Sequence, residues 1–171
     1  MKILVSASSK HGSTASIAAG IAEELRTHGH TVDLEAPDYV HAIEPYDACV
    51  IGSAVFFGRW MEPARELVTR HANELRARPV WLFSSGPLGD LHDRADAVEG
   101  EKHAAAIGAR EHRVFDGALD RDDVGLGERF AIGIARAPYG DFRNWGDIRS
   151  WARTIAIELT PGDVLPEPIP A

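Results

Sequence analysis

Five apolar runs alternate with longer amphipathic stretches along this chain of 171 residues. Each run is short and either continuously hydrophobic or alternating, which is typical of strands buried in a sheet. The runs predict strands at residues 2–7, 31–35, 48–53, 79–83 and 112–115. In the second strand, Val32 and Leu34 are expected to lie on one face because side chains alternate along a strand.

Apolar residues spaced three and four apart predict a helix after every strand except the second. The first helix is expected to end at Gly29, because glycine favours the position just past a helix. The third covers about residues 95–109 and the last covers residues 145–159. The apolar sides of the first two helices are Ile17, Ala18, Ile21, Ala22 and Leu25, and Ala64, Leu67, Val68, His71 and Leu75.

The alternation of strands and helices determines the predicted fold class. Such crossover units build a parallel sheet with helices on both faces. Residues 1–160 are therefore predicted to form one α/β domain, a three-layer α/β/α sandwich. Residues 161–171 contain four prolines, which cannot continue a helix, and are predicted to be a loose tail.

Three polar, glycine-bearing turns follow the first, third and fourth predicted strands. In a parallel sheet the carboxyl ends of the strands meet at one edge, and ligands bind there. The turns are therefore expected to meet around a ligand. The candidate cofactor-binding residues are Ser9, Lys10, His11, Gly12, Ser13 and Thr14; Ala54, Val55, Phe56, Phe57, Gly58 and Trp60; and Ser84, Ser85, Gly86, Pro87, Leu88 and Gly89.

The chemistry of these turns suits a ligand with a phosphate and a flat ring. The hydroxyls of the first turn and the N–H groups of the following helix suit a phosphate. The aromatic side chains of the second turn suit an apolar ring face, and the third turn offers backbone groups. These features also have purely structural explanations. The first turn could simply cap a helix, and Phe56 and Phe57 are equally well explained as core residues.

The spacing of the first turn narrows the choice of ligand. The chain has no Gly-x-x-x-x-Gly-Lys-Ser/Thr loop, and no Gly-x-Gly-x-x-Gly follows the first strand. The pattern Ser-x-x-Gly-x-Thr at 9–14 instead resembles the phosphate loop of flavodoxins. This resemblance, which extends to about Leu159, implies FMN as cofactor and a flavodoxin-like five-stranded sheet of order 2-1-3-4-5. It also implies that the peptide at Gly58 hydrogen-bonds flavin N5, because glycine changes backbone orientation at little cost.

The end of the domain resembles the menaquinone-dependent protoporphyrinogen oxidase group in three motifs, 114–119, 140–145 and 148–152. The resemblance implies an FMN-dependent oxidoreductase that passes electrons through flavin N5. It further implies oxidation of protoporphyrinogen IX in heme biosynthesis, with a quinone as acceptor. Lys10 fits this group, which has a basic residue at that position, whereas carrier flavodoxins keep the loop free of basic side chains. The insert at 120–140 departs from the group, because it is shorter and begins with acidic residues.

Other functions remain open. A non-catalytic, flavodoxin-type electron carrier that docks on redox protein partners is the main alternative, and the net charge of −8 suits docking on basic partners. A flavin-free interaction domain of the same fold is another. A pyridine-nucleotide-dependent quinone reductase fits less well, because no second nucleotide site is recognisable. No catalytic residue is assigned; His11, Asp90 and Asp93 are the candidate acids or bases near the site.

Composition excludes several classes of function. The net charge argues against nucleic-acid binding. The single cysteine, Cys49, rules out internal disulfides and is predicted to be a small buried hydrophobe. Histidines without ligand spacing predict no metal site. Neither a signal peptide nor a transmembrane segment is predicted, so the expected location is cytoplasmic. Peripheral membrane contact and a homo-oligomer stay open.

Overall fold

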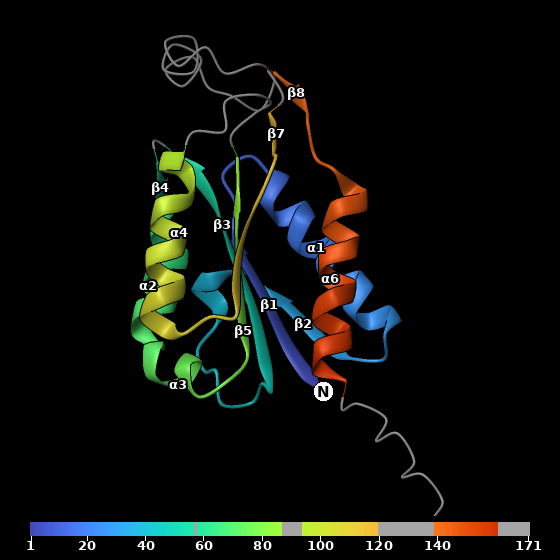
Figure 1. The fold of residues 1–171 in the computed structure, drawn as a ribbon. Helices are drawn as coiled ribbons and strands as arrows, with labels where there is room; N and C mark the ends of the chain where they lie inside the picture. The colour runs from blue at the N-terminus through green and yellow to red at the C-terminus, as the bar shows by residue number, and fades with distance from the viewer. Residues whose placement is uncertain (57, 87–93, 120–138, 161–171) are drawn as a thin grey trace, which may run out of the picture.

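The computed structural model describes residues 1–56, 58–86, 94–119 and 139–160 (Figure 1). Its strands are β1 Lys2–Ser8, β2 Thr31–Glu35, β3 Ala48–Phe56, β4 Arg59–Trp60, β5 Val80–Ser85, β6 Glu111–Phe115, β7 Ala118–Leu119 and β8 Gly140–Asp141. Its helices are α1 Ser13–Thr27, α2 Glu62–Arg70, α3 Ala72–Arg76, α4 Arg94–Ile107 and α6 Trp145–Leu159, with a short 3₁₀ helix η1 at Pro37–Tyr39. Every predicted strand and helix has a counterpart among these elements.

The main sheet has the order β2-β1-β3-β5-β6, and these strands are parallel. The short β4 pairs antiparallel with the end of β3 and lies off this path. Without β4, the order is the predicted 2-1-3-4-5. Helices α1 and α6 cover one face of the sheet, and α2, α3 and α4 cover the other (Figure 1). The predicted three-layer sandwich is therefore confirmed.

Two hydrophobic cores lie on opposite faces of the sheet, and β1 contributes to both. Ile3 and Val5 pack with the apolar residues of α1 and α6, whereas Leu4 packs with those of α2 and α3. In the first core the rings of Phe115 and Trp151 meet edge to face, with centroids 5.4 Å apart. These cores fix α1 and the central strands, and with them the carboxyl edge of the sheet, where the predicted ligand turns lie.

The third strand is longer than predicted, because it continues into a hairpin. Val55 pairs with Trp60 and Phe56 with Arg59, so residues 54–56, expected in a turn, belong to β3. A two-residue partner strand carries no periodicity that could have predicted this hairpin.

The second helix, the strand β2 and Cys49 can each be compared with the sequence predictions. The predicted second helix is divided into α2 and α3 at His71. Val32 and Leu34 share one face of the edge strand β2, but only Val32 is buried, and Leu34 is 41% exposed. Cys49 is fully buried, as predicted, and burial raises the pKa of its thiol to about 12.

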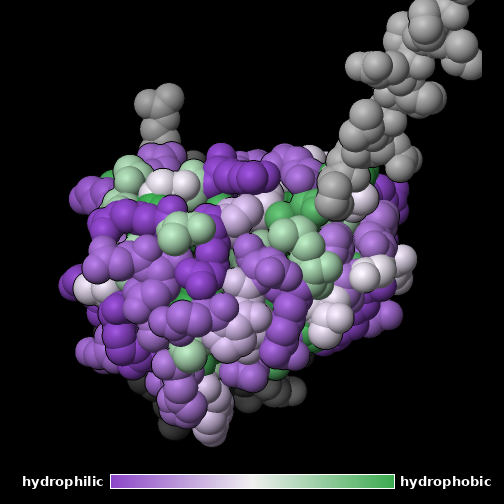
Figure 2. Space-filling model, turned by 90° about the horizontal axis from the view of Figure 1, so that it is seen from below, coloured by the Kyte–Doolittle hydropathy of each residue, from purple (hydrophilic) through white to green (hydrophobic). Residues whose placement is uncertain are grey.

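The end of the molecule opposite the carboxyl edge is mostly hydrophilic, as Figure 2 shows from below. Among the described residues, no helix is both long enough and apolar enough to span a membrane.

Gly52 in β3 gives a first testable prediction. A Cβ at this position would overlap the ring of Phe83 in the neighbouring strand. We expect Gly52→Ala to lower the free energy of unfolding by about 1–3 kcal/mol, since overpacking a filled core forces side chains to shift. Urea unfolding measures the effect. In a Phe83→Leu background the loss should be smaller, and equal losses in both backgrounds would contradict the overlap.

Candidate functional site

The turn after β1, residues 9–14, is called the first loop below, and it leads directly into α1. The N-cap of α1 is Gly12, which has φ +81° and supplies no side-chain hydrogen bond. Only glycine adopts this left-handed conformation at no steric cost. The first turn of α1 also contains no acidic side chain. The first N–H groups of the helix are therefore uncapped and present partial positive charge to an anion at the carboxyl edge.

The serine hydroxyls of the first loop differ in their surroundings. The Oγ of Ser9 is buried and has no hydrogen-bond partner among the described residues. An unsatisfied buried hydroxyl costs about 1–3 kcal/mol, and a ligand oxygen would remove that cost. The Oγ of Ser13 accepts a hydrogen bond of 2.8 Å from the backbone N–H of Ala118 and keeps its own proton available as a donor.

The turns after β5 and β6 pack against the first loop through glycine. Gly86 N donates to Phe115 O at 3.2 Å. A Cβ at Gly117 would lie 3.3 Å from Gly86 N and 3.5 Å from Ser13 Oγ. Gly117 and Ala118 therefore lie against the first loop and the turn at Gly86, although they were not among the predicted site residues. The position of β6 beside β5 in the predicted sheet was the available signal, because its turn opens on the same edge.

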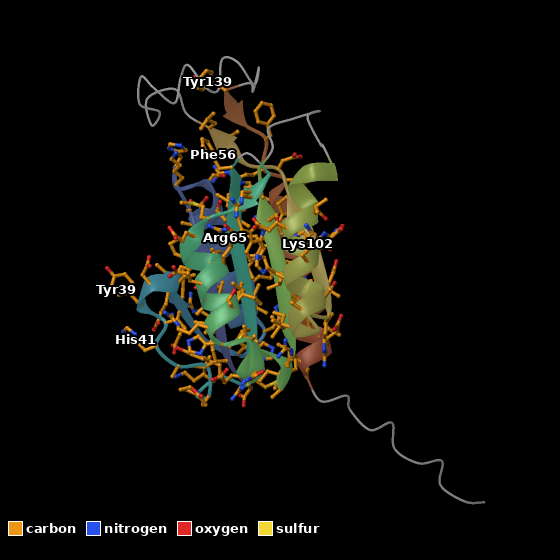
Figure 3. The ribbon with its side chains drawn as sticks, turned by 90° about the vertical axis from the view of Figure 1, so that its left-hand side faces the viewer. Tyr39, His41, Phe56, Arg65, Lys102 and Tyr139 are labelled. Atoms are coloured by element: carbon orange, nitrogen blue, oxygen red, sulfur yellow. The ribbon has the colours of Figure 1, made fainter. Side chains whose placement is uncertain are left out.

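The hairpin after β3 brings one aromatic ring to this edge. Phe56 is 36% exposed (Figure 3). The Nζ of Lys10 lies 4.1 Å from the centroid of the Phe56 ring. Gly58, at the tip of the hairpin, has φ +71°. The first loop and the hairpin are thus in contact. The first loop, the ring of Phe56 and the turn at Gly86, one part of each of the three predicted turns, lie at the same edge of the sheet.

Known proteins share the sequence family and the fold of this chain. Residues 4–142 match a family model described as "Flavodoxin domain". The chain belongs to this flavodoxin family. It is 34% identical over 89 residues to the protoporphyrinogen IX dehydrogenase [quinone] of Escherichia coli (strain K12). That match covers 49% of this chain and 48% of the relative, so the chain spans about half the length of the curated relatives it matches.

Solved structures show the same fold. The flavodoxin of Streptococcus pneumonia TIGR4 has a TM-score of 0.63 at 16% identity and covers 93% of this chain and 100% of its own. The rubredoxin oxygen:oxidoreductase of Desulfovibrio gigas has a TM-score of 0.64 at 15% identity, covering 92% of this chain and 35% of its own. Membership in the flavodoxin family implies a flavin cofactor.

Trp60 does not take the place in the flavodoxin site that its sequence position suggested. It is 2% exposed and belongs to the second core, so its ring is not available to a ligand at the edge. Its Nε1–H donates to Ser84 Oγ at 2.8 Å, and its backbone N–H donates to the carboxylate of Glu99. Trp60 thus anchors the hairpin that carries Phe56 and Gly58.

The serines of β5 are also structural. Ser84 and Ser85 are buried inside the strand, and Ser84 Oγ lies 2.8 Å from His112 Nε2 as well as accepting from Trp60. Ala54 and Val55 are half-buried strand residues. Thr14 is buried at the start of α1. The predicted residues Phe57, Pro87, Leu88 and Gly89, with the candidate acids Asp90 and Asp93, lie outside the described residues.

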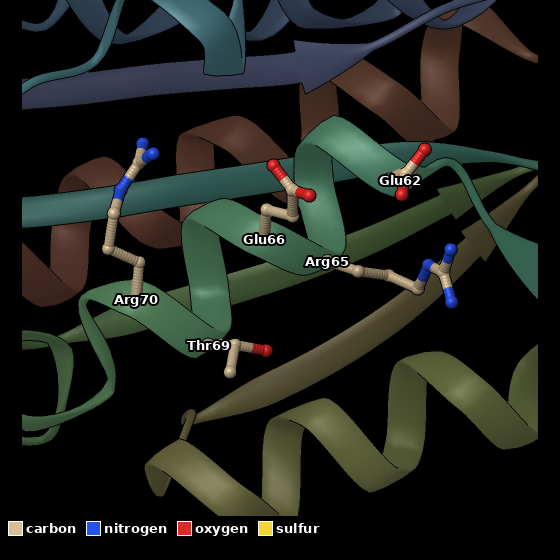
Figure 4. A pocket seen from close by; sticks show the side chains of 5 residues that line it. All are labelled: Glu62, Arg65, Glu66, Thr69 and Arg70. Carbon is tan, nitrogen blue, oxygen red and sulfur yellow. The ribbon is translucent and has the colours of Figure 1, made fainter.

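A surface depression elsewhere is not part of this site. It is lined by Glu62, Arg65, Glu66, Thr69 and Arg70 (Figure 4). All five residues belong to α2, and their charges balance, so no second element converges on a ligand there. In the described part of the chain, no group of three or more His, Cys, Asp or Glu side chains is placed to hold a metal ion.

The half-buried histidines next to Trp60, His103 and His112, predict a pH-dependent stability. Burial lowers the pKa of both His103 and His112. As the pH falls, these histidines therefore bind protons more readily in the unfolded chain than in the folded one. The contribution of these two histidines to the free energy of unfolding is therefore fully present above pH about 6.5, the pKa of an unfolded histidine, and is lost as the pH falls below it. Urea unfolding between pH 7.5 and 5.5 measures this loss.

Substitution tests how much His112 contributes to this pH dependence. We expect a shallower pH dependence for His112→Gln than for the natural chain. The exposed His41 offers a matched control, since His41→Gln should leave the slope unchanged. Identical slopes in all three proteins would contradict the assignment.

Proposed function

We propose that this flavodoxin domain binds FMN at its carboxyl edge and acts as an FMN-dependent oxidoreductase. The observation that carries the proposal is the buried hydroxyl of Ser9, which has no hydrogen-bond partner among the described residues, in the loop that leads to the uncapped start of α1. A phosphate supplies the acceptor oxygens that both features lack. The hydroxyls of Ser13 and Thr14 and the N–H groups of the first loop would complete its coordination.

The other components suit the ring of FMN. Phe56 exposes part of its ring on the same edge, and aromatic faces stack on flat ring systems. Gly58 and Gly86 have positive φ and lie at the ends of β3 and β5 on the same edge, and their peptides would offer backbone groups to the polar edge of the flavin ring. The ammonium of Lys10, already in contact with Phe56, would favour the uptake of negative charge by the ring. When bound, FMN supplies hydride or electron transfer through N5.

The proposed substrate pair is protoporphyrinogen IX and a quinone. Support comes from the 34% identity to protoporphyrinogen IX dehydrogenase [quinone] over half of the chain and from the motifs that resemble that group. Electron carriage between proteins is the second candidate. This candidate is favoured because two arginines near the edge are paired with carboxylates. Arg59 lies 3.9 Å from Glu99, and Arg143 lies 2.6 Å from Asp141. Paired arginines attract the propionates of a porphyrinogen less than unpaired ones.

Replacement of Gly12 tests the phosphate end of the site. We expect the purified protein to bind FMN and Gly12→Ala to weaken binding about fivefold to thirtyfold, since a left-handed alanine costs about 1–2 kcal/mol. Gly29 is a matched control at the other end of α1, with φ +83° and, like Gly12, nothing within 4 Å of an added Cβ. Gly29→Ala should reduce stability but not FMN affinity, as measured by flavin fluorescence. Absence of FMN binding in the natural chain would contradict the proposal.

Turnover separates the enzyme from the carrier. With FMN bound, we expect anaerobic formation of protoporphyrin from protoporphyrinogen IX that depends on an added menaquinone analogue, followed by porphyrin fluorescence. FMN-loaded protein without such turnover, reduced in two separate one-electron steps, would instead identify a carrier.

A further inference from the structure

We propose that Arg143 is a positioning residue for the first loop: it acts through Ser16 to hold the start of α1 in the form that receives the phosphate of FMN. The inference deepens the FMN-binding function proposed above and rests on it. Arg143 lies more than a hundred residues from the first loop in sequence, yet the fold places its guanidinium against the first turn of α1.

A short chain of hydrogen bonds connects Arg143 to the loop. Its Nη1 donates to Ser16 Oγ, and Ser16 Oγ donates to the carbonyl oxygen of Ser13 at 2.6 Å. Ser13 Oγ in turn accepts from Ala118 N at 2.8 Å. The residue that lies at the junction of loop and helix is therefore held from both its backbone and its side chain.

Arg143 is itself held rigidly. Its Nε and Nη2 donate to the two carboxylate oxygens of Asp141 at 2.8 and 2.6 Å, and its guanidinium lies 5.0 Å from the ring centroid of Trp145. The Arg143 side chain is only 18% exposed. Hydrogen bonding to Arg143 lowers the pKa of Asp141 to about 2, so the pair stays ionised at neutral pH. The planar fork thus presents its remaining nitrogen, Nη1, to Ser16 in one orientation.

The small sheet formed by β7 and β8 brings both contacts to the same helix turn. Ala118 of β7 pairs with Asp141 of β8, and Phe142 N donates to Gly117 O at 3.1 Å. One strand therefore supplies the donor to Ser13, and the other supplies the carboxylate that orients the donor to Ser16. Ser13 and Ser16 are three residues apart and lie on one side of α1. A loop ordered in advance binds its ligand more tightly, because less freedom is lost on binding.

The test compares FMN with riboflavin, which has the same ring but no phosphate. We expect Arg143→Met to weaken FMN binding about tenfold, the scale of one lost charge-assisted hydrogen bond, and to change riboflavin binding less than about twofold. Arg143→Lys should also weaken FMN selectively, since an ammonium lacks the planar fork that holds Asp141 and reaches Ser16. Arg149→Met is the matched control: Arg149 is exposed on α6, and its loss removes the same charge.

A double-variant cycle tests the route through Ser16. Ser16→Ala should produce the same selective loss, and adding it to Arg143→Met should cost little more than either alone. Additive losses would overturn the route, and an unchanged ratio of FMN to riboflavin affinity in Arg143→Met would overturn the proposal. Thermal unfolding confirms that each variant is folded; if Arg143→Met is not, Ser16→Ala and Arg143→Lys decide by the same ratio. Failure of FMN binding itself is distinguishable, because the unchanged protein would then bind neither flavin.

Discussion

The burial of α1 between the sheet and α6 is the constraint on which the carboxyl edge depends. Ile17, Ile21 and Leu25 are fully buried, and burial of each such side chain contributes about 1.5–3 kcal/mol. The Arg153 guanidinium on α6 also donates to Glu24 on α1 at 3.1 Å. With β1 buried before it and α1 behind it, the first loop has both ends fixed. Only the conformation of the few residues between them is left to local interactions.

Those local interactions are mainly contacts between loops rather than contacts with either core. Gly86 and Gly117 bring two backbones close together beside Ser13, where a Cβ on Gly117 would make a tight contact of 3.3 Å with Gly86 N. The hairpin is set by different means, since Trp60 is buried and its indole is hydrogen-bonded to Ser84. Trp60 thus supports the edge from within, and the small residues Gly86, Gly117 and Ser13 meet at the edge itself. This division leaves Phe56 as the exposed aromatic ring described at the edge.

The sequence predicted the elements well where burial produces a pattern. Continuous apolar runs located the parallel strands, and the strict helical spacing from Trp145 to Leu159 gave the bounds of α6. Prediction failed where a residue's role depends on partners distant in sequence. Trp60 and Ser84 have side chains common in ligand-binding turns, but their contact across 24 residues makes them structural. The link from Arg143 to Ser16 spans 127 residues and has no local signature. For the residues of the first loop, the assignment to a phosphate stays a prediction.

The pairing of charges at the edge bears on how an anion would be held there. The Arg143 guanidinium is neutralised by Asp141, and Arg59 lies 3.9 Å from Glu99, in a chain whose net charge is −8. Among the described residues, the attraction for the proposed phosphate would come from Lys10 and from N–H and hydroxyl groups of the first loop. Such groups act at hydrogen-bond distance and in fixed directions, unlike a net charge, whose field extends further. Recognition would then depend on the tetrahedral shape of the phosphate, which makes the positions of Ser9, Gly12 and Ser13 decisive.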